Sequence, residues 1–208
     1  KKLEGKARIL ELGYGDGIIN KNLLAKGFAV DVLEGSPKVV ERAKKECSSL
    51  NIQQTLFETF KTDQKYDSIL ALHVLEHVDH PVDLLRKMME WLSEDGELVI
   101  IVPNKNSIHR QLAVEMGLQH KLDDLSPRDL LVGHQRVYSL QSLRKDIEEA
   151  GYKVVEETGF FLKTLPNGMM LDYSHELITA MNTISDKIPP QLLANIGMTV
   201  KVNRDEKS

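Results

Sequence analysis

A short stretch in the first half of the chain gathers side chains that could transfer protons or bind a metal ion. The sequence "LALHVLEHVDHP" contains His73, Glu76 and His77. The order His-x-x-Glu-His is also that of a class of zinc peptidase, whose ligands lie on one continuous helix. Pro81 favours a helix start, so the three side chains precede that helix. We reject the peptidase interpretation and leave two roles open: proton transfer, or hydrogen bonds that orient a turn.

A glycine-rich loop precedes this stretch and could let the main chain approach a ligand. The sequence "ELGYGDG" places Gly13, Gly15 and Gly17 between a predicted strand and a predicted helix. Glycine allows sharp turns and close contact between backbone and ligand. A dinucleotide fingerprint would need a further glycine at the position of Ile18, and the lysine of a phosphate-binding P-loop is absent. The loop therefore predicts a nucleoside ligand with no diphosphate to hold.

An acidic residue closes the next predicted strand. Glu34 follows the apolar run "FAVDVL". In open parallel sheets ligands bind beyond the carboxyl ends of the strands. An acidic side chain at that place can accept hydrogen bonds from both hydroxyls of a ribose. Taken alone, Glu34 could equally be a solvated acid at a strand end. Beside the glycine loop, we interpret it as a ribose ligand.

The elements that would position these residues alternate between strand and helix over the first hundred residues. Short apolar runs predict buried strands, and Ser36 before Pro37 is a strong helix start. The predicted strands are 7–12, 28–34, 52–58, 66–74 and 96–104, and the predicted helices are 18–27, 36–50 and 81–92. Such alternation indicates right-handed βαβ units and a doubly wound parallel sheet.

The pattern changes after the fifth predicted strand. Residues 104–138 carry mixed helix and turn signals, and we expect them to form a substrate cap. The regular elements then resume as a helix, a strand, a second helix and a last strand at 139–151, 152–163, 169–188 and 195–202. We expect residues 1–208 to form a single domain, with 104–138 as an insertion in it.

The composition is typical of a globular protein and does not favour a nucleic-acid partner. The chain has 208 residues, of which 41% are hydrophobic and 28% are charged, with a formal net charge of −4. Its apolar runs are too short to span a bilayer, and the opening "KKLEG" does not resemble a signal peptide. The single Cys47 fits a reducing compartment. We expect a cytoplasmic monomer or homodimer with no membrane span.

Taken together, these motifs resemble the class I S-adenosylmethionine-dependent methyltransferases. The resemblance rests on the glycine loop, Glu34, "YDSILALHVLEHV" and "LSEDGELVIIVPN", and is strongest for the small-molecule branch that includes ubiquinone-type O-methyltransferases. The segment "VGHQRVYSLQSLRKDIEEAGYKV" is similar to one found in many bacterial members. The resemblance implies an α/β fold: a three-layer, doubly wound, mostly parallel seven-stranded Rossmann-like sheet with a small helical cap after the fifth strand.

The resemblance also implies an activity. We expect methyl transfer from S-adenosyl-L-methionine, leaving S-adenosyl-L-homocysteine, by in-line SN2 displacement. The acceptor would be a small molecule, with the oxygen of a metabolite or of a saccharide or lipid precursor favoured. The Asp/Asn-Pro-Pro-aromatic motif of nucleic-acid amino-methyltransferases is absent. A catalytically silent cofactor-binding protein and a nicotinamide-dependent oxidoreductase remain as alternatives.

Site residues follow from the same resemblance and from residue chemistry. The cofactor-binding candidates are Glu11, Gly13, Tyr14, Gly15, Asp16, Gly17, Glu34, Gly35, Phe57, Glu58, Leu72 and His73. The candidate bases are His77 and His134, because histidine titrates near neutral pH. The candidate substrate-binding residues, in or next to the predicted cap, are His109, Arg136 and Tyr138.

A metal site is a further alternative within this family. Some ubiquinone-pathway methyltransferases carry Glu-x-x-Glu-His at this place and use a divalent metal. Here His73 replaces the first glutamate, which disfavours the oxygen ligands that magnesium prefers. We therefore expect no metal ligands.

Overall fold

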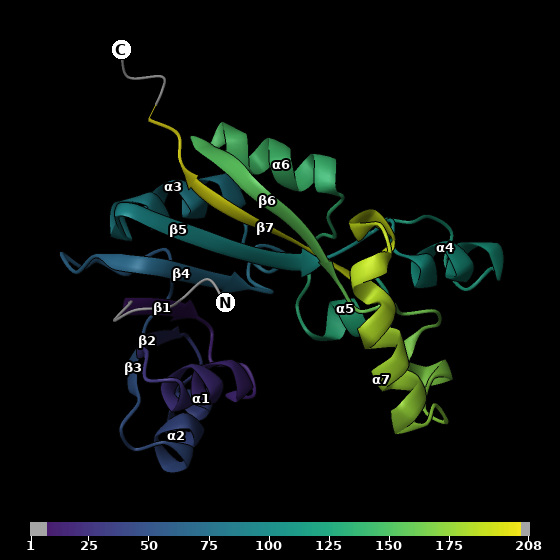
Figure 1. The fold of residues 1–208 in the computed structure, drawn as a ribbon, viewed down its shortest axis with the longest axis horizontal. Helices are drawn as coiled ribbons and strands as arrows, with labels where there is room; N and C mark the ends of the chain where they lie inside the picture. Colours follow the sequence, from purple (N-terminus) through teal and green to yellow (C-terminus); the bar gives the residue numbers. More distant parts are fainter. Residues whose placement is uncertain (1–7, 205–208) are drawn as a thin grey trace.

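Seven strands form one sheet in the computed structural model, which describes residues 8–204 (Figure 1). The strands are β1 (Arg8–Leu12), β2 (Ala29–Glu34), β3 (Asn51–Gln54), β4 (Tyr66–Leu72), β5 (Leu92–Pro103), β6 (Tyr152–Phe160) and β7 (Asn195–Val202). Their order across the sheet is β3-β2-β1-β4-β5-β7-β6. Strands β1 to β6 run in one direction, and β7, which lies between β5 and β6, runs antiparallel to both. The predicted fold class, a mostly parallel seven-stranded sheet, is confirmed.

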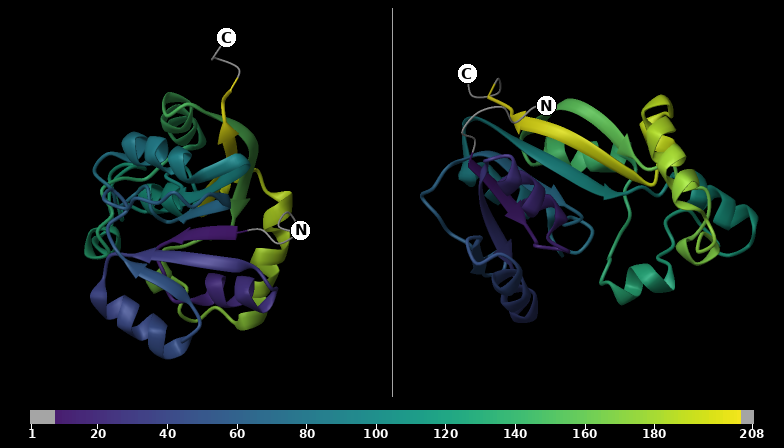
Figure 2. Two further views of the ribbon diagram at one scale, coloured as in Figure 1. Left: turned by 90° about the vertical axis from the view of Figure 1, so that its left-hand side faces the viewer. Right: turned by 60° about the horizontal axis from the view of Figure 1, so that its bottom comes forward.

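Helices cover both faces of this sheet (Figures 1 and 2). The helices are α1 (Ile18–Ala25), α2 (Pro37–Glu46), α3 (Pro81–Trp91), α4 (Ile108–Glu115), α5 (Pro127–Leu131), α6 (Leu140–Glu149) and α7 (His175–Ile184). Three single 3₁₀ turns lie at Asn167–Met169, Ser185–Lys187 and Pro190–Leu192. As predicted, Ser36 caps α2 by accepting a hydrogen bond from Val39 N, with Pro37 in the first turn.

The three layers follow from the alternation of side chains along each strand. Ile9 of β1 belongs to a buried cluster with Val40 of α2. Its neighbour Leu10 belongs to a second cluster, with Leu85 of α3 and Leu143 of α6. Because successive strand residues point to opposite faces, one strand supplies both hydrophobic cores.

The chain reverses its direction of travel across the sheet at β1. From β1 it crosses to β2 and β3 on one side, and it then returns to β4 on the other side of β1. The connections that leave the carboxyl ends of β1 and β4 therefore diverge, and this switch point is where open α/β sheets bind ligands. The glycine loop and the histidine stretch follow these two strands, so the topology brings them to one edge.

The predicted alternation of strand and helix fails between β3 and β4. The structure has no helix in residues 55–65, and β3 ends at Gln54, before the predicted limit of 58. Only Ile52 of this edge strand is buried, so few apolar contacts extend it. Phe60 in the connection packs edge-to-face on Trp91 of α3, with ring centroids 5.1 Å apart. This aromatic contact covers the core between the two strands.

Helices α4, α5 and α7 gather beyond one end of the sheet (Figure 1 and the right panel of Figure 2). The first two lie in the predicted insertion 104–138, whereas α7 belongs to the connection between β6 and β7 and is shorter than the predicted helix 169–188. None of the helices between residues 8 and 204 combines the length and apolar character that a bilayer-spanning segment needs. The opening residues, on which the expectation of no signal peptide rests, lie outside the described range.

Substitution of two glycines with left-handed backbone should destabilise the fold to different extents. Gly17 and Gly27 have φ angles of 79° and 83°. A Cβ on Gly17 would lie 2.5 Å from the hydroxyl oxygen of the buried Tyr14, whereas a Cβ on Gly27 would meet nothing within 4 Å. We expect Gly27→Ala to lower the free energy of unfolding by about 1–2 kcal/mol, and Gly17→Ala by about 2–4 kcal/mol, because steric overlap adds to the strain.

Urea unfolding of the two variants and the wild type measures this difference. Gly27→Ala is the matched control for backbone strain alone. Equal losses would show that Tyr14 can move aside and that the contact does not fix the loop.

Candidate functional site

A cavity of about 510 Å³ lies at the carboxyl ends of the central strands. Its walls come from the glycine loop, the end of β2, the β3–β4 connection and the turn after β4. The lining residues are Glu11, Leu12, Gly13, Tyr14, Gly15, Asp16, Ile19, Glu34, Phe57, Leu72, His73, Val74 and His77. This volume lies in the range of small-molecule and cofactor sites.

The glycine loop forms one wall of the cavity with its main chain. Gly13 and Gly15 have φ angles of 82° and 56°, which residues with a side chain rarely adopt. A Cβ at either position would have no neighbour within 4 Å, so the requirement here is conformational. The backbone N–H of Gly13 donates a 2.7 Å hydrogen bond to the carbonyl of Leu33, which ties the loop to β2.

Glu34 fixes the same loop from the end of β2. One carboxylate oxygen accepts the backbone N–H of Tyr14 at 3.0 Å, and the other accepts the N–H of Ser36 at 2.8 Å. A carboxylate has about four lone-pair sites, so both oxygens can accept further hydrogen bonds from a ligand. The sequence predicts the position of Glu34 beside the loop, but it does not predict that this side chain also holds the loop.

Glu11 is a buried acid on the cavity wall. It is 4% exposed, and its Oε2 has no hydrogen-bond partner within the described chain. Burial raises the pKa of its carboxyl to about 7. Asn20 lies close enough to lower that pKa in part, although its amide forms no hydrogen bond of normal geometry. An unpartnered carboxylate oxygen fits a cavity that receives a cationic ligand.

Several expected cofactor residues contribute differently from the prediction. The Tyr14 side chain packs in the core beside α2 and donates its hydroxyl hydrogen bond to Glu46 at 3.0 Å, so mainly its backbone faces the cavity. Three other predicted cofactor residues, Gly17, Gly35 and Glu58, lie in the described part of the chain but do not line the cavity. Glu58 instead borders a neighbouring cleft. The structure adds the apolar residues Leu12, Ile19 and Val74 to the cavity wall. In the sequence they are distinguished only by their proximity to the glycine loop and to the histidine stretch.

The histidine stretch forms a turn. Strand β4 ends at Leu72 and α3 begins at Pro81, with no helix between them, so rejection of the peptidase interpretation is confirmed. His73 has a left-handed φ of 57°, and its Nδ1 lies 2.9 Å from Oε1 of Glu76. Glu76 is fully buried, and its Oε2 has no partner among the described residues.

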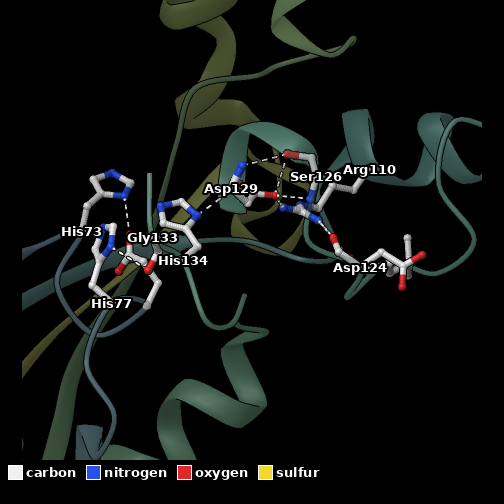
Figure 3. A network of polar contacts seen from close by, with 10 residues as sticks. His73, His77, Arg110, Asp124, Ser126, Asp129, Gly133 and His134 are labelled. Atoms are coloured by element: carbon white, nitrogen blue, oxygen red, sulfur yellow. Dashed lines mark hydrogen bonds and ion pairs between the residues drawn. The ribbon is translucent and has the colours of Figure 1, made fainter. Parts of the chain in front are cut away.

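His134, which lies between α5 and α6, joins this turn (Figure 3). Its ring packs edge-to-face on that of His77, with centroids 4.7 Å apart and the planes at 71°. The Nδ1 atoms have different partners: a carbonyl oxygen of Gly133 at 3.2 Å for His77, and Oδ1 of Asp129 at 3.1 Å for His134. The two candidate bases, which are far apart in the sequence, are therefore neighbours at the cavity edge.

The same side chains include a possible set of metal ligands. Glu76, His77 and His134 each offer one ligand atom, and these atoms lie within 4.8 Å of one another. Two histidines and a carboxylate are ligands that transition metals accept. The expectation of no metal ligands rested on His73 alone and did not include His134.

The three expected substrate-binding residues do not line the cavity. Arg136 donates from Nη1 to the main-chain carbonyls of Leu75 and Val78. Tyr138 is 3% exposed and donates its hydroxyl hydrogen bond to Asp146 at 3.2 Å. His109 on α4 has a buried Nδ1 with no partner among residues 8–204, and burial lowers its pKa to about 3. Their sequence context predicted polar contacts with a substrate, but the side chains of Arg136 and Tyr138 make hydrogen bonds within the fold.

Comparison with known proteins gives one matching family. A family model described as a methyltransferase domain matches residues 1–157, which is most of the chain. The mitochondrial ubiquinone biosynthesis O-methyltransferase of Schizosaccharomyces pombe is 28% identical over 117 residues, which are 53% of this chain and 43% of that protein. The chain spans less than half the length of the curated relatives that it matches.

Solved structures share the fold. A methyltransferase from Archaeoglobus fulgidus, described as S-adenosylmethionine-dependent, has a TM-score of 0.63 at 18% identity and covers 95% of this chain and 87% of its own. A 1,6-didemethyltoxoflavin-N1-methyltransferase from Burkholderia thailandensis, solved with S-adenosylhomocysteine, has a TM-score of 0.63 at 14% identity and covers 97% and 73%.

Glu11 gives this site a pH dependence that can be measured. Its pKa is raised from the ordinary value of 4.5 to about 7, so between these values the folded protein binds more protons than the unfolded chain. The free energy of unfolding should therefore fall as the pH rises through this range, by roughly 3 kcal/mol from this group. Glu11→Gln should remove that part of the slope.

Chemical unfolding at a series of pH values between 4.5 and 8 isolates the effect, because other titrating groups cancel in the difference between wild type and variant. If the two curves remain parallel, Glu11 is not the titrating group.

Proposed function

The chain belongs to the methyltransferase-domain family, and from this membership we propose that it transfers a methyl group from S-adenosylmethionine to an oxygen atom of a small-molecule acceptor. The sequence-based identification as a class I S-adenosylmethionine-dependent methyltransferase related to the ubiquinone O-methyltransferases is confirmed. The family and its solved structures also support S-adenosylmethionine as the cofactor. When bound, this cofactor supplies a methyl group on a positively charged sulfur.

The observation that carries the proposal is the cavity itself. It brings the open backbone of Gly13 and Gly15, the acids Glu11 and Glu34, and the histidine turn to one place beyond the central strands. This arrangement fits a nucleoside that carries a positive charge on the group attached to its ribose. The orphaned oxygen of Glu11 supports this fit, because a bound cation would favour the charged carboxylate.

Within this proposal each wall of the cavity has a role. Glu34 accepts the ribose hydroxyls, and the main chain of the glycine loop lies against the sugar and the methionine portion. Phe57 flanks the adenine ring. Leu72 and His73 lie beside the methionine amine and the sulfonium. These residues line the cavity, which supports the assignment.

The proposal of an oxygen acceptor rests on the relatives and on the histidines. The curated relatives are O-methyltransferases by name. A hydroxyl group must lose its proton when it is methylated, and histidine is suited to accept it near neutral pH. His77 lines the cavity and His134 packs against it. We propose that this pair forms the polar side of the acceptor site, with alignment of the reactants supplying much of the rate enhancement.

The proposed activity can be tested in two steps. Titration calorimetry with S-adenosylhomocysteine should give a micromolar dissociation constant. Tritiated S-adenosylmethionine should then label an acceptor within a panel of catechols, phenols, alcohols, amines and thiols, with the hydroxyl compounds favoured.

Two controls separate the alternatives. NADPH should not raise the thermal unfolding temperature, whereas S-adenosylhomocysteine should raise it. Binding without any methyl transfer would favour a catalytically silent protein, and transfer only to amines or thiols would contradict the oxygen acceptor.

The role proposed for Glu34 has its own test. Glu34→Ala should weaken S-adenosylhomocysteine binding by roughly 1–3 kcal/mol, the value of a lost charged hydrogen bond. Because Glu34 also holds the loop, the comparison needs a ligand that lacks the 2′ and 3′ ribose hydroxyls. The loss should be much smaller for this dideoxy analogue. An equal loss for both ligands would assign Glu34 to the loop alone.

A further inference from the structure

Asp129 links the candidate base His134 to the rest of the insertion. It lies in the first turn of α5, where Ser126 and Asp129 form a capping box. Its Oδ1 lies 3.1 Å from Nδ1 of His134. Its Oδ2 accepts hydrogen bonds from the Ser126 backbone N–H at 2.9 Å, from the Ser126 hydroxyl at 2.8 Å and from Nη2 of Arg110 at 2.8 Å (Figure 3). One carboxylate oxygen of Asp129 therefore contacts His134, and the other accepts hydrogen bonds from Ser126 and Arg110.

The surroundings keep this carboxylate ionised. The Asp129 and Arg110 side chains are 14% and 7% exposed. Three donors converge on Oδ2 of Asp129, and one of them is the charged guanidinium of Arg110, an arrangement that favours the ionised carboxylate. An ionised carboxylate only accepts hydrogen bonds, so His134 must donate from Nδ1. In the neutral ring the lone pair then lies on Nε2.

We propose that Asp129 is a positioning residue that holds His134 with its Nε2 free to accept the proton of the acceptor hydroxyl, an inference that rests on the proposed methyl transfer to oxygen. The His134 side chain is 13% exposed and packs on His77, which lines the cavity. A hydroxyl seated beside His77 is thus within reach of His134. The structure assigns the base role to His134 and a contact role to His77.

The partner of each Nδ1 distinguishes the two histidines. His134 faces a carboxylate, whereas His77 faces the neutral carbonyl of Gly133. A carboxylate at Nδ1 fixes the tautomer and compensates the positive charge when the ring takes up a proton. In the step, the acceptor O–H bond breaks and its proton moves to Nε2 of His134. The acceptor oxygen bonds to the methyl carbon, and the electrons of the broken C–S bond stay on the product sulfur.

The hydrogen bonds of Asp129 make Asp129→Asn an unusually decisive variant. Three donors converge on the Oδ2 position, so the amide oxygen of an asparagine must occupy it. The NH₂ group is then left facing Nδ1 of His134 and must donate to it. The variant therefore forces the opposite tautomer, with the proton on Nε2, while the shape of the side chain is retained.

The first test uses no substrate. In long-range ¹H–¹⁵N spectra of chelator-treated, histidine-labelled protein at high pH, with His134 assigned from His134→Gln, the wild type should show Nδ1–H and a free Nε2. Asp129→Asn should show the reverse. An Nε2–H tautomer in the wild type overturns the inference, and because this measurement needs no variant of Asp129, misfolding cannot obscure it.

The second test is kinetic and uses the acceptor from the panel that the wild type methylates best. Asp129→Asn should lower kcat by about 10²–10⁴-fold, the usual contribution of a general base, with little change in KM or in S-adenosylhomocysteine affinity. Ser139→Ala is the matched control: it removes the same kind of capping bond, at α6, away from the cavity, and should change kcat less than about threefold. A similar loss in both variants would show a structural role only.

The outcomes separate this inference from the proposed function. If the wild type does not bind S-adenosylhomocysteine or transfers no methyl group, the proposed function fails. If it is active and Asp129→Asn keeps its kcat, only the role of Asp129 fails. A stoichiometric divalent metal in the purified protein, removed by a chelator together with activity, would make Nε2 of His134 a metal ligand with Glu76 and His77, and would overturn the inference.

Discussion

The cavity depends on the two hydrogen bonds that the carboxylate of Glu34 accepts from the main chain. The glycine loop adopts left-handed backbone angles and has no regular secondary structure to stabilise it. Glu34 accepts the N–H groups of Tyr14 and Ser36, and so joins the loop after β1 to the turn after β2. Hydrogen bonds to a charged group contribute about 1.5–3 kcal/mol each, which is enough to select one loop conformation.

Two acids with little exposure show how the surroundings decide what a carboxyl group can do. Glu11 has an orphaned oxygen and a raised pKa, so its neutral form is populated near neutral pH until a cation approaches. Asp129 receives several donors and has a lowered pKa, so it stays charged and orients what it contacts. The first arrangement suits ligand binding and the second suits positioning. Both acids are mostly buried, and the difference lies in the donors around them.

The opposite side of the cavity depends on hydrogen bonds between distant segments. Arg136 donates to carbonyls of the turn after β4. Next to it, the backbone N–H of Gln135 donates to the carbonyl of Glu76 at 2.8 Å, and the Gln135 side chain donates to the carbonyl of His77 at 2.7 Å. These contacts keep His134 beside His77. Arg136 therefore shapes the site through main-chain contacts, although its sequence context predicted a ligand contact.

The sequence by itself determined the succession of strands along the first half of the chain, the position of the glycine loop and the acid beside it. These features depend on local signals: apolar runs, caps, and glycines that permit left-handed turns. It also predicted α3 nearly to its ends and the start of α2, whereas α2 ends at Glu46, before the predicted limit of 50. It did not predict how early β3 ends, because the burial of only Ile52 in this edge strand is a property of the folded chain. The meeting of His77, His134, Asp129 and Arg110 was decided by tertiary structure alone, because hydrogen bonds between segments far apart in the sequence leave no periodic pattern. Tertiary structure also decided which side chains are buried. Burial governs whether Glu11 is charged and whether Tyr138 faces a ligand or the core.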